Sequence, residues 1–195
     1  MSPRARPMSP EERRADLTDV TLRLLRVHGR DVTTRQIAEA AGIAEGTVFR
    51  AFASKDELMD AAVARAFEPG DVVARIEEID ADLPLRERLV LLVSILQQRF
   101  RATFDLMQKM GFVGPPRHLR DQAAVEEWRA RQELLLLAVV GDDADQLRVP
   151  VTEFVHVLRM LTFAGSHDHI ADGHLLTPDE IVDTLLLGLL RRPGC

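Results

Sequence analysis

Apolar residues recur at three- and four-residue spacing along most of this chain, which is the period of an α-helix. The first such stripe follows Ser9-Pro10-Glu11-Glu12, a sequence that places Ser at the N-cap, Pro at N1 and Glu at N3. Gly29 follows the stripe and is expected to end the helix. The apolar positions of this first predicted helix are Leu17, Val20, Leu24 and Val27.

The apolar spacing next predicts two short helices between Thr33 and Phe52. Thr33 and Gln36 form a capping box that starts the first of them, and Gly42 just past its end suits a left-handed turn. Val48 and Phe52, four residues apart, face the same core from the second helix. The remaining positions of that second helix, Glu45, Gly46, Thr47 and Arg50, then point outward. A compact helix pair with an exposed second helix has the geometry that enters a DNA major groove.

Further helices account for the remainder of the chain. Ser54 and Glu57 cap a third helix of the unit, which continues to Phe67, and Pro69-Gly70 marks a domain boundary. Beyond it, the pattern predicts helices over about 72–79, 84–109, 121–140, 151–170 and 181–190, with a loop at 111–116 and an acidic turn at 141–143. We therefore predict an all-α protein with three parts: a disordered arm at 1–8, a three-helix DNA-binding domain at 9–68 whose helix-turn-helix motif is 33–52, and a helical domain at 69–195.

Composition and charge indicate which part of the protein could face DNA and in which compartment the protein works, but they add little about the fold. The net charge of −6 divides unevenly: residues 1–56 carry ten Arg or Lys and eight Asp or Glu, a balance of +2, whereas residues 57–195 carry −8. The acidic part can therefore face away from a duplex while the N-terminal part faces it. The one cysteine, Cys195, excludes an internal disulfide, and no signal peptide or bilayer-spanning apolar run is present. These features predict a cytoplasmic protein that does not enter a membrane.

The two C-terminal helices are apolar around much of their circumference. A helix of that kind must be buried, and one at the end of the chain can be buried either within the monomer or against a second copy. We favour a homodimer because palindromic operators require two-fold symmetry, and Gly188 would allow a close approach of the partner. The predicted interface residues are Val155, Leu158, Thr162, Ile181, Leu185, Gly188 and Leu189.

The sequence contains little that indicates a metal site or a catalytic site. His167, His169 and His174 lie near one another in sequence, but the first two would point to different sides of a helix, and a structural zinc site needs four well-placed ligands. No phosphate-binding loop, nucleophile elbow or zinc-protease motif occurs. We expect no metal, no cofactor and no enzymatic activity.

The region from Thr33 to Leu58 resembles the DNA-binding domain of the TetR (tetracycline-repressor-like) family of bacterial transcription regulators. The resemblance is carried by Thr33-Thr34, Ile37-Ala38, Ala41-Gly42-Ile43, Gly46-Thr47-Val48-Phe49, Phe52, Ser54-Lys55 and Leu58. It covers the first third of the chain; beyond it, only length and helical character agree with the family. It implies DNA contacts by Thr34, Arg35, Glu45, Gly46, Thr47, Phe49, Arg50 and Lys55.

Three positions depart from the family pattern. Ala44 stands where Ser is common, Phe49 where Tyr is usual, and Ala51 where His or Tyr is frequent. Each change removes a possible phosphate contact, which weakens affinity without changing the sequence that is read. We expect weaker, more salt-sensitive binding that depends on the arginines.

The resemblance further implies a pocket for a small-molecule effector in the second domain. Polar residues interrupt the apolar stripes there, and aromatic and Met side chains could form the walls. The candidate lining residues are Gln97, Arg101, Phe104, Met107, Trp128, His156, Arg159 and Phe163. The sequence thus predicts a homodimeric repressor that binds a palindromic operator and is released by a ligand. Two alternatives stay open: an activator of the same family, and an all-helical sensor or scaffold whose DNA affinity has weakened.

Overall fold

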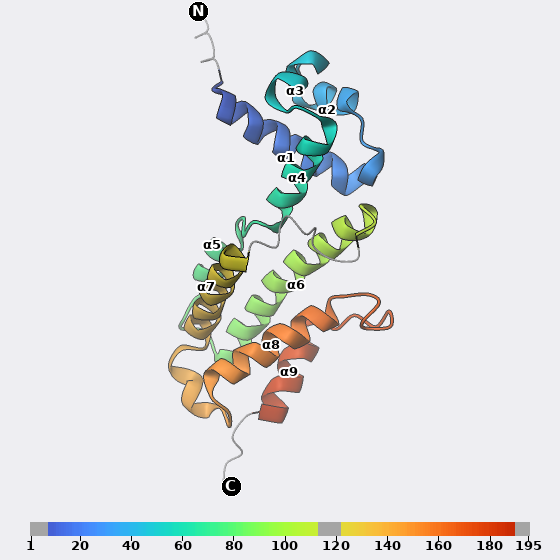
Figure 1. Cartoon of the computed structure of the whole chain (residues 1–195). Helices are drawn as coiled ribbons and strands as arrows, with labels where there is room; N and C mark the ends of the chain where they lie inside the picture. The colour runs from blue at the N-terminus through green and yellow to red at the C-terminus, as the bar shows by residue number, and fades with distance from the viewer. Residues whose placement is uncertain (1–7, 113–121, 190–195) are drawn as a thin grey trace, which may run out of the picture. The chain divides into compact units, whose positions relative to one another are not determined.

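The computed structural model describes residues 8–112 and 122–189, and every regular element in those ranges is a helix (Figure 1). The prediction of an all-α protein is confirmed. Among the helices of these ranges, none combines the length and the apolar character that crossing a bilayer requires. The elements are α1 (Pro10–His28), η1 (Gly29–Asp31), α2 (Thr34–Ala41), α3 (Glu45–Ala51), α4 (Lys55–Phe67), α5 (Val72–Glu77), α6 (Leu85–Lys109), α7 (Gln122–Val140), η3 (Gly141–Gln146), α8 (Val151–Gly165) and α9 (Pro178–Leu189).

The predicted helix starts are confirmed in detail. Ser9 and Glu12 form a reciprocal capping box at α1, in which the Glu12 amide donates to Ser9 Oγ and the Ser9 amide donates to the Glu12 carboxylate. The same arrangement joins Thr33 and Gln36 at α2. At α4 the Ser54 hydroxyl accepts from the amide of Glu57. These side chains satisfy amide groups that a helix start leaves without an intrahelical partner.

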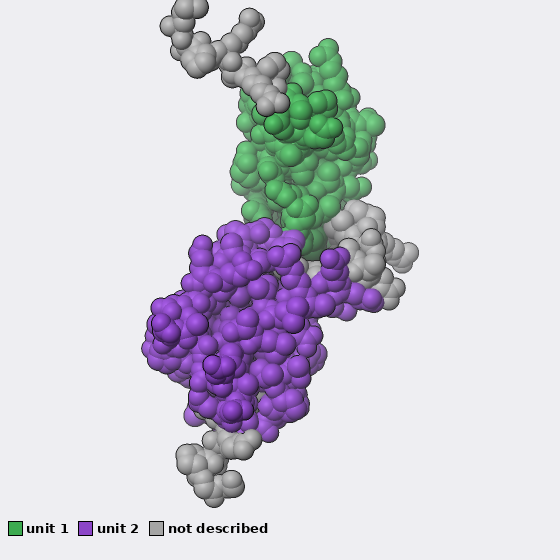
Figure 2. All heavy atoms as spheres, turned by 90° about the vertical axis from the view of Figure 1, so that its left-hand side faces the viewer, with its two compact units in different colours: residues 1–68, 105–119 green, residues 69–104, 120–195 purple. Residues whose placement is uncertain are grey.

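The chain divides into two compact units (Figure 2). Unit 1 contains residues 1–68 and 105–119, and unit 2 contains residues 69–104 and 120–195. The division after Glu68 coincides with the predicted boundary. Within the helical domain predicted at 69–195, residues 105–119 group with unit 1, and the domain assignment itself stays a prediction. Residues 1–7 of the predicted N-terminal arm lie outside the described residues, and so does the loop predicted at 111–116 from residue 113 on.

The core of unit 1 joins α1 to α4 with the last turns of α6. Leu17, Leu25 and Ile37 are fully enclosed in it, and Leu106 and Met110 of α6 join the same cluster. The two helix ends approach closely because Gly29 has φ +58° and no side chain: a Cβ there would lie 2.6 Å from the Lys109 carbonyl oxygen. The Lys109 ammonium donates to the carbonyl oxygen of Arg26, in the last turn of α1. A cation at this position is favourable because the helix dipole is negative at its C-terminus.

Unit 2 packs α5, the N-terminal part of α6, α7, α8 and α9 around a second core. The α8 helix ends at Gly165, five residues before the predicted end at Ile170. The chain turns back there, so that the Leu176 amide donates to the Gly165 carbonyl, and a Cβ on Gly165 would lie 3.0 Å from the Leu176 side chain. A continued helix would separate these two segments. Apolar side chains at the centre of this core include Leu89, Leu92, Val93, Phe154, Leu158 and Ile181.

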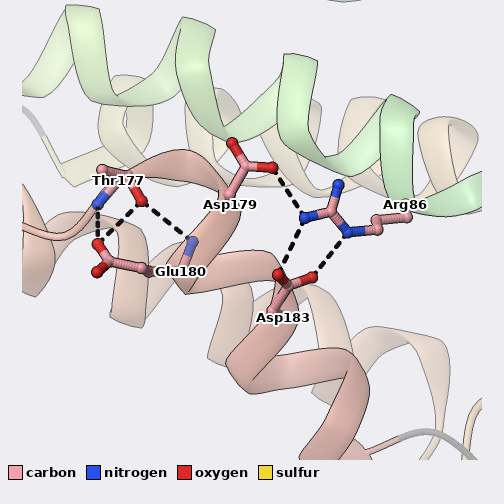
Figure 3. Close-up of polar contacts among 5 residues, drawn as sticks. All are labelled: Arg86, Thr177, Asp179, Glu180 and Asp183. Carbon is pink, nitrogen blue, oxygen red and sulfur yellow. Dashed lines mark hydrogen bonds and ion pairs between the residues drawn. The ribbon is translucent and has the colours of Figure 1, made fainter.

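The start of α9 is fixed by polar contacts on its first turns (Figure 3). Thr177 and Glu180 form a capping box that the sequence analysis did not identify. Arg86 of α6 donates to Asp183 through Nε at 2.7 Å and to Asp179 through Nη2 at 2.8 Å. Hydrogen bonding from Arg86 lowers the pKa of Asp183, and hydrogen bonds from the amide and hydroxyl of Thr177 lower the pKa of Glu180.

Candidate nucleic-acid interface

The helix-turn-helix forms as predicted from α2, a tight turn and α3. Gly42 adopts φ +66° and ψ 33°, the left-handed conformation, and its amide donates back to the carbonyls of Ala38 and Glu39. Ile37 of α2 and Val48 of α3 are buried in the same cluster, as is Phe52 directly after α3. The inner faces of the two short helices therefore pack into the core of unit 1, which leaves their outer faces free.

The outer face of α3 carries the residues expected to contact DNA. Glu45, Gly46, Phe49 and Arg50 are exposed, and Phe49 keeps 50% of its surface accessible. A Cβ on Gly46 would meet no atom within 4 Å, so another molecule can approach the backbone closely at this point. Of the remaining predicted contacts, Arg35 is exposed and Thr34, Thr47 and Lys55 are half-buried.

Two predicted contact residues are joined by a hydrogen bond between the helices, since the Thr34 hydroxyl donates to the Glu45 carboxylate. Arg35 donates through Nε to Glu39 at 2.9 Å, and this contact raises the pKa of Arg35. Both partners are largely exposed, so the pair is weak and a phosphate can displace Glu39. Within the described residues, Arg50 and Lys55 have no ion-pair partner and keep their charge available.

The end of α3 is held by Arg14 of α1. Its guanidinium donates to the Ala51 carbonyl and, at 2.9 Å, to the Glu57 carboxylate. Glu57 also accepts from the amide of Ala53 at 2.7 Å. These donors, with Arg14 first, lower the pKa of Glu57. The sequence analysis did not identify this role of Arg14, because its partners lie 37 to 43 residues away along the chain.

Alanine at position 44 leaves the start of α3 without a side-chain cap. The N-cap of this helix makes no side-chain hydrogen bond. The first amide groups of α3 are therefore not capped by a side chain. Glu45, the first residue of the helix, is exposed. The absence of a hydroxyl here removes one group that could contact a phosphate.

The predicted effector-site residues do not form one group. Phe104 and Phe163 pack edge to face with ring centroids 5.0 Å apart. Gln97 is buried and, like Arg101, donates to the Leu176 carbonyl. The other four are dispersed: Met107 groups with unit 1, His156 is exposed, Arg159 is half-buried, and the side chain of Trp128 lies outside the described residues. A pocket lined by these eight residues stays a prediction.

The predicted dimer-interface residues differ in how exposed they are. Val155, Leu158, Thr162, Ile181 and Leu185 are buried within unit 2, so the outer surface of α8 and α9 is made by other positions. These side chains already have intramolecular partners, and their part in a dimer interface stays a prediction. Gly188 is exposed, and the side chain of Leu189 lies outside the described residues. Exposed apolar residues on the two helices are Met160, Phe163 and Leu187.

Two of the histidines between α8 and α9, His167 and His169, make ring contacts with tilted or edge-on geometry. The rings of His167 and His169 have centroids 6.0 Å apart, and His167 also packs on Phe104 at 4.5 Å. In residues 8–112 and 122–189 no three His, Cys, Asp or Glu side chains are grouped closely enough to hold a metal ion.

A capped helix pair with an exposed second helix, joined to a larger helical unit, is the arrangement of a helix-turn-helix motif. Residues 17–62 match the family model described as "Bacterial regulatory proteins, tetR family". This part of the chain is therefore similar to the DNA-binding region of TetR-family regulators.

Individual proteins are also similar to this chain in sequence or in fold. Over 93 residues the chain is 39% identical to the HTH-type transcriptional repressor KstR of Rhodococcus jostii (strain RHA1), and the match spans 47% of this chain and 41% of the relative. A TetR-family regulator from Streptomyces coelicolor has a similar fold, with TM-score 0.61, 24% identity, and coverage of 92% of this chain and 79% of that one. The ketosteroid transcriptional regulator KstR2 of Mycobacterium tuberculosis is also similar, with TM-score 0.55, 21% identity, and coverage of 92% and 96%.

Proposed function

We propose that this chain is a homodimeric repressor that binds a palindromic DNA operator through Thr34–Arg50 and is released by a small molecule. The observation that carries the proposal is the outer face of α3, where Glu45, Phe49 and Arg50 are exposed beside the unobstructed backbone of Gly46. The relative KstR is named a repressor, which supports repression over activation.

Each contact type has a distinct role in this proposal. Arg35 and Arg50 read base edges, since a guanidinium can donate twice to guanine, whereas Lys55 neutralises a phosphate. The Thr34 hydroxyl orients Glu45 on the first turn of α3. A carboxylate at that place can accept from the amino group of cytosine.

A second copy is required because a palindrome presents two equivalent half-sites. Support for pairing comes from the exposed apolar residues of α8 and α9, among which Met160 keeps 53% and Leu187 76% of its surface accessible. Sedimentation at micromolar concentration should give a dimer, and Leu187→Glu should weaken it. A matched control is Leu91→Glu, since Leu91 is also exposed but lies on α6.

Effector release requires that the ligand prefer the state with weak DNA binding. A hundredfold loss of operator affinity corresponds to a coupling free energy of about 3 kcal/mol.

Selection from random duplexes tests the proposal directly. We expect enrichment of an inverted repeat whose half-sites are separated by about one helical turn. Flat recovery at low salt would instead support the all-helical sensor with weakened DNA binding. Fusion of the enriched repeat to a reporter promoter then separates a repressor, which lowers expression, from an activator, which raises it.

A further inference from the structure

The outer face of α2 carries an ion pair that the sequence analysis did not identify. Arg35 donates through Nε to the Glu39 carboxylate at 2.9 Å, one helical turn further along the chain. The side chain of Arg35 keeps 81% of its surface accessible and that of Glu39 keeps 63%. Within the described ranges this pair engages only Nε, so neither terminal nitrogen of Arg35, Nη1 or Nη2, has an acceptor. The guanidinium is therefore held at one nitrogen and free to donate from the other two.

A second carboxylate acts on the same arginine. The pKa of Arg35 is raised, first by the hydrogen bond to Glu39 and further by the negative charge of Glu45, the first residue of α3. The Thr34 hydroxyl donates to Glu45 and so holds that carboxylate where α2 and α3 meet. One arginine here faces two carboxylates, and the local balance of charge is negative. This part of the surface therefore attracts a phosphate less strongly than the unpaired Arg50 does.

Phosphates and Glu39 compete for Arg35. On a duplex of arbitrary sequence the attraction is mainly electrostatic, because each cation that neutralises a phosphate releases counterions. Arg35 can neutralise a phosphate only after it leaves Glu39, whose carboxylate would then remain unpaired beside a polyanion. Glu39 therefore reduces the contribution of Arg35 to binding that does not depend on sequence.

A guanine edge requires something different from the same side chain. Its O6 and N7 atoms are neutral acceptors that take two hydrogen bonds from one guanidinium. Nη1 and Nη2 can donate these two bonds while Nε keeps its bond to Glu39, since the five N–H groups of arginine form a planar fork. The carboxylate also restricts rotation of the guanidinium, which reduces the entropy lost when the two bonds form.

We propose that Glu39 is a positioning residue for base recognition: it holds Arg35 through Nε, presents Nη1 and Nη2 to a guanine, and keeps the arginine from neutralising phosphates. The inference rests on the proposed function, because it concerns how the same interface selects its operator. It predicts that the ratio of operator affinity to non-operator affinity depends on Glu39, although Glu39 itself contacts no base.

The test compares the full wild-type chain with Glu39→Gln, Arg35→Gln and the double variant, on the duplex enriched by selection and on a scrambled duplex of equal length. Glutamine keeps the length and helix propensity of glutamate and removes its charge. In Glu39→Gln the affinity for the scrambled duplex should rise about three- to fivefold and the salt slope should steepen by up to about one, because Arg35 becomes free to bind a phosphate. Operator affinity should not rise, since the loss of alignment offsets the loss of repulsion. The ratio of the two affinities should therefore fall at least about threefold.

Two controls separate this role from a general effect of charge. Glu127→Gln removes the same charge at an exposed position of α7, in unit 2, and should leave the ratio of the two affinities unchanged. In the Arg35→Gln background, Glu39→Gln should no longer steepen the salt slope, because the side chain that it releases is absent.

Three results would overturn the inference: an equal rise on both duplexes, a rise that persists in the Arg35→Gln background, and unchanged binding to the scrambled duplex. Failure of the proposed function gives a different result, because the selection then enriches no inverted repeat. In that case the scrambled duplex at low salt still shows whether Glu39 withholds Arg35 from phosphates. An enriched repeat with an unchanged ratio of affinities refutes this inference alone.

Discussion

The guanidinium carbon of Arg14 lies 4.0 Å from the centroid of the Phe52 ring. This contact joins the first helix of unit 1 to the residue that directly follows the exposed helix α3. The same guanidinium donates to the Ala51 carbonyl and to Glu57. A side chain on α1 therefore holds the C-terminal end of the helix expected to enter the groove.

Arg14→Ala should destabilise unit 1 by about 1–2 kcal/mol. The change removes a cation–π contact at a partly exposed site and a charged hydrogen bond to a backbone carbonyl, both of modest value in water. Denaturant unfolding measures the loss. Arg23→Ala is the control, because Arg23 is exposed on the same helix and has no ion-pair partner in the described ranges. Equal stability of the two variants would contradict this role of Arg14.

Gly29→Ala should destabilise the protein more than Gly70→Ala. Both residues have positive φ, +58° and +57°, so both substitutions strain the backbone, and the ψ of −138° at Gly29 puts it outside the left-handed α region, where alanine is strained further. Only at Gly29 would the new Cβ also lie 2.6 Å from a backbone oxygen, that of Lys109, whereas at Gly70 it would meet open space. Thermal unfolding of the two variants measures the combined cost of this contact and of the backbone conformation at Gly29. A smaller loss at Gly29 would mean that α6 does not end against α1.

The Arg86–Asp183 contact predicts a pH dependence. The pKa of Asp183 is lowered in the folded state, so its contribution to stability is present above the unfolded value of about 3.9 and is lost as pH falls through the lower folded value. In Arg86→Gln the pKa of Asp183 should return toward its ordinary value, as followed by carboxyl ¹³C shifts. The stability difference between wild type and variant should be constant above about pH 5 and should shrink below pH 4. A difference that grows in acid would rule out this coupling.

Arg50→Ala and Lys55→Ala should change DNA binding in different ways. Arg50→Ala should cost about 1–3 kcal/mol on the selected operator and relax the preference at one base position. Lys55→Ala should weaken binding to all duplexes alike and reduce the salt slope by about one. Titrations at several salt concentrations, on the selected operator and on a scrambled duplex, measure both effects. Unchanged binding in both variants would refute the residue assignment.

Phe49→Tyr should strengthen DNA binding without changing which sequence is preferred. Phe49 keeps half of its surface exposed on α3, so a hydroxyl added to its ring has room to contact a phosphate. The gain should be about two- to tenfold on operator and scrambled duplexes alike. A gain confined to the operator would indicate that residue 49 reads a base.

The local features of this protein were determined by its sequence. The capping pairs Ser9–Glu12 and Thr33–Gln36 and the left-handed Gly42 involve residues three apart or a single backbone conformation, so adjacent residues are sufficient to specify them. The outward direction of Glu45 and Arg50 followed from the helical period, once Val48 and Phe52 were assigned to the core.

Only the tertiary structure decided which distant residues meet. It placed Arg14 at the end of α3, the end of α6 in the core of unit 1, and the buried Arg88 against the Val139 carbonyl and Asp143. It also showed that Leu158 and Ile181 are buried within their own unit, whereas an apolar helix alone is equally consistent with burial against a second copy. The physical reason is that apolar periodicity shows which face of a helix is buried, but the partner of that face depends on how the whole chain packs.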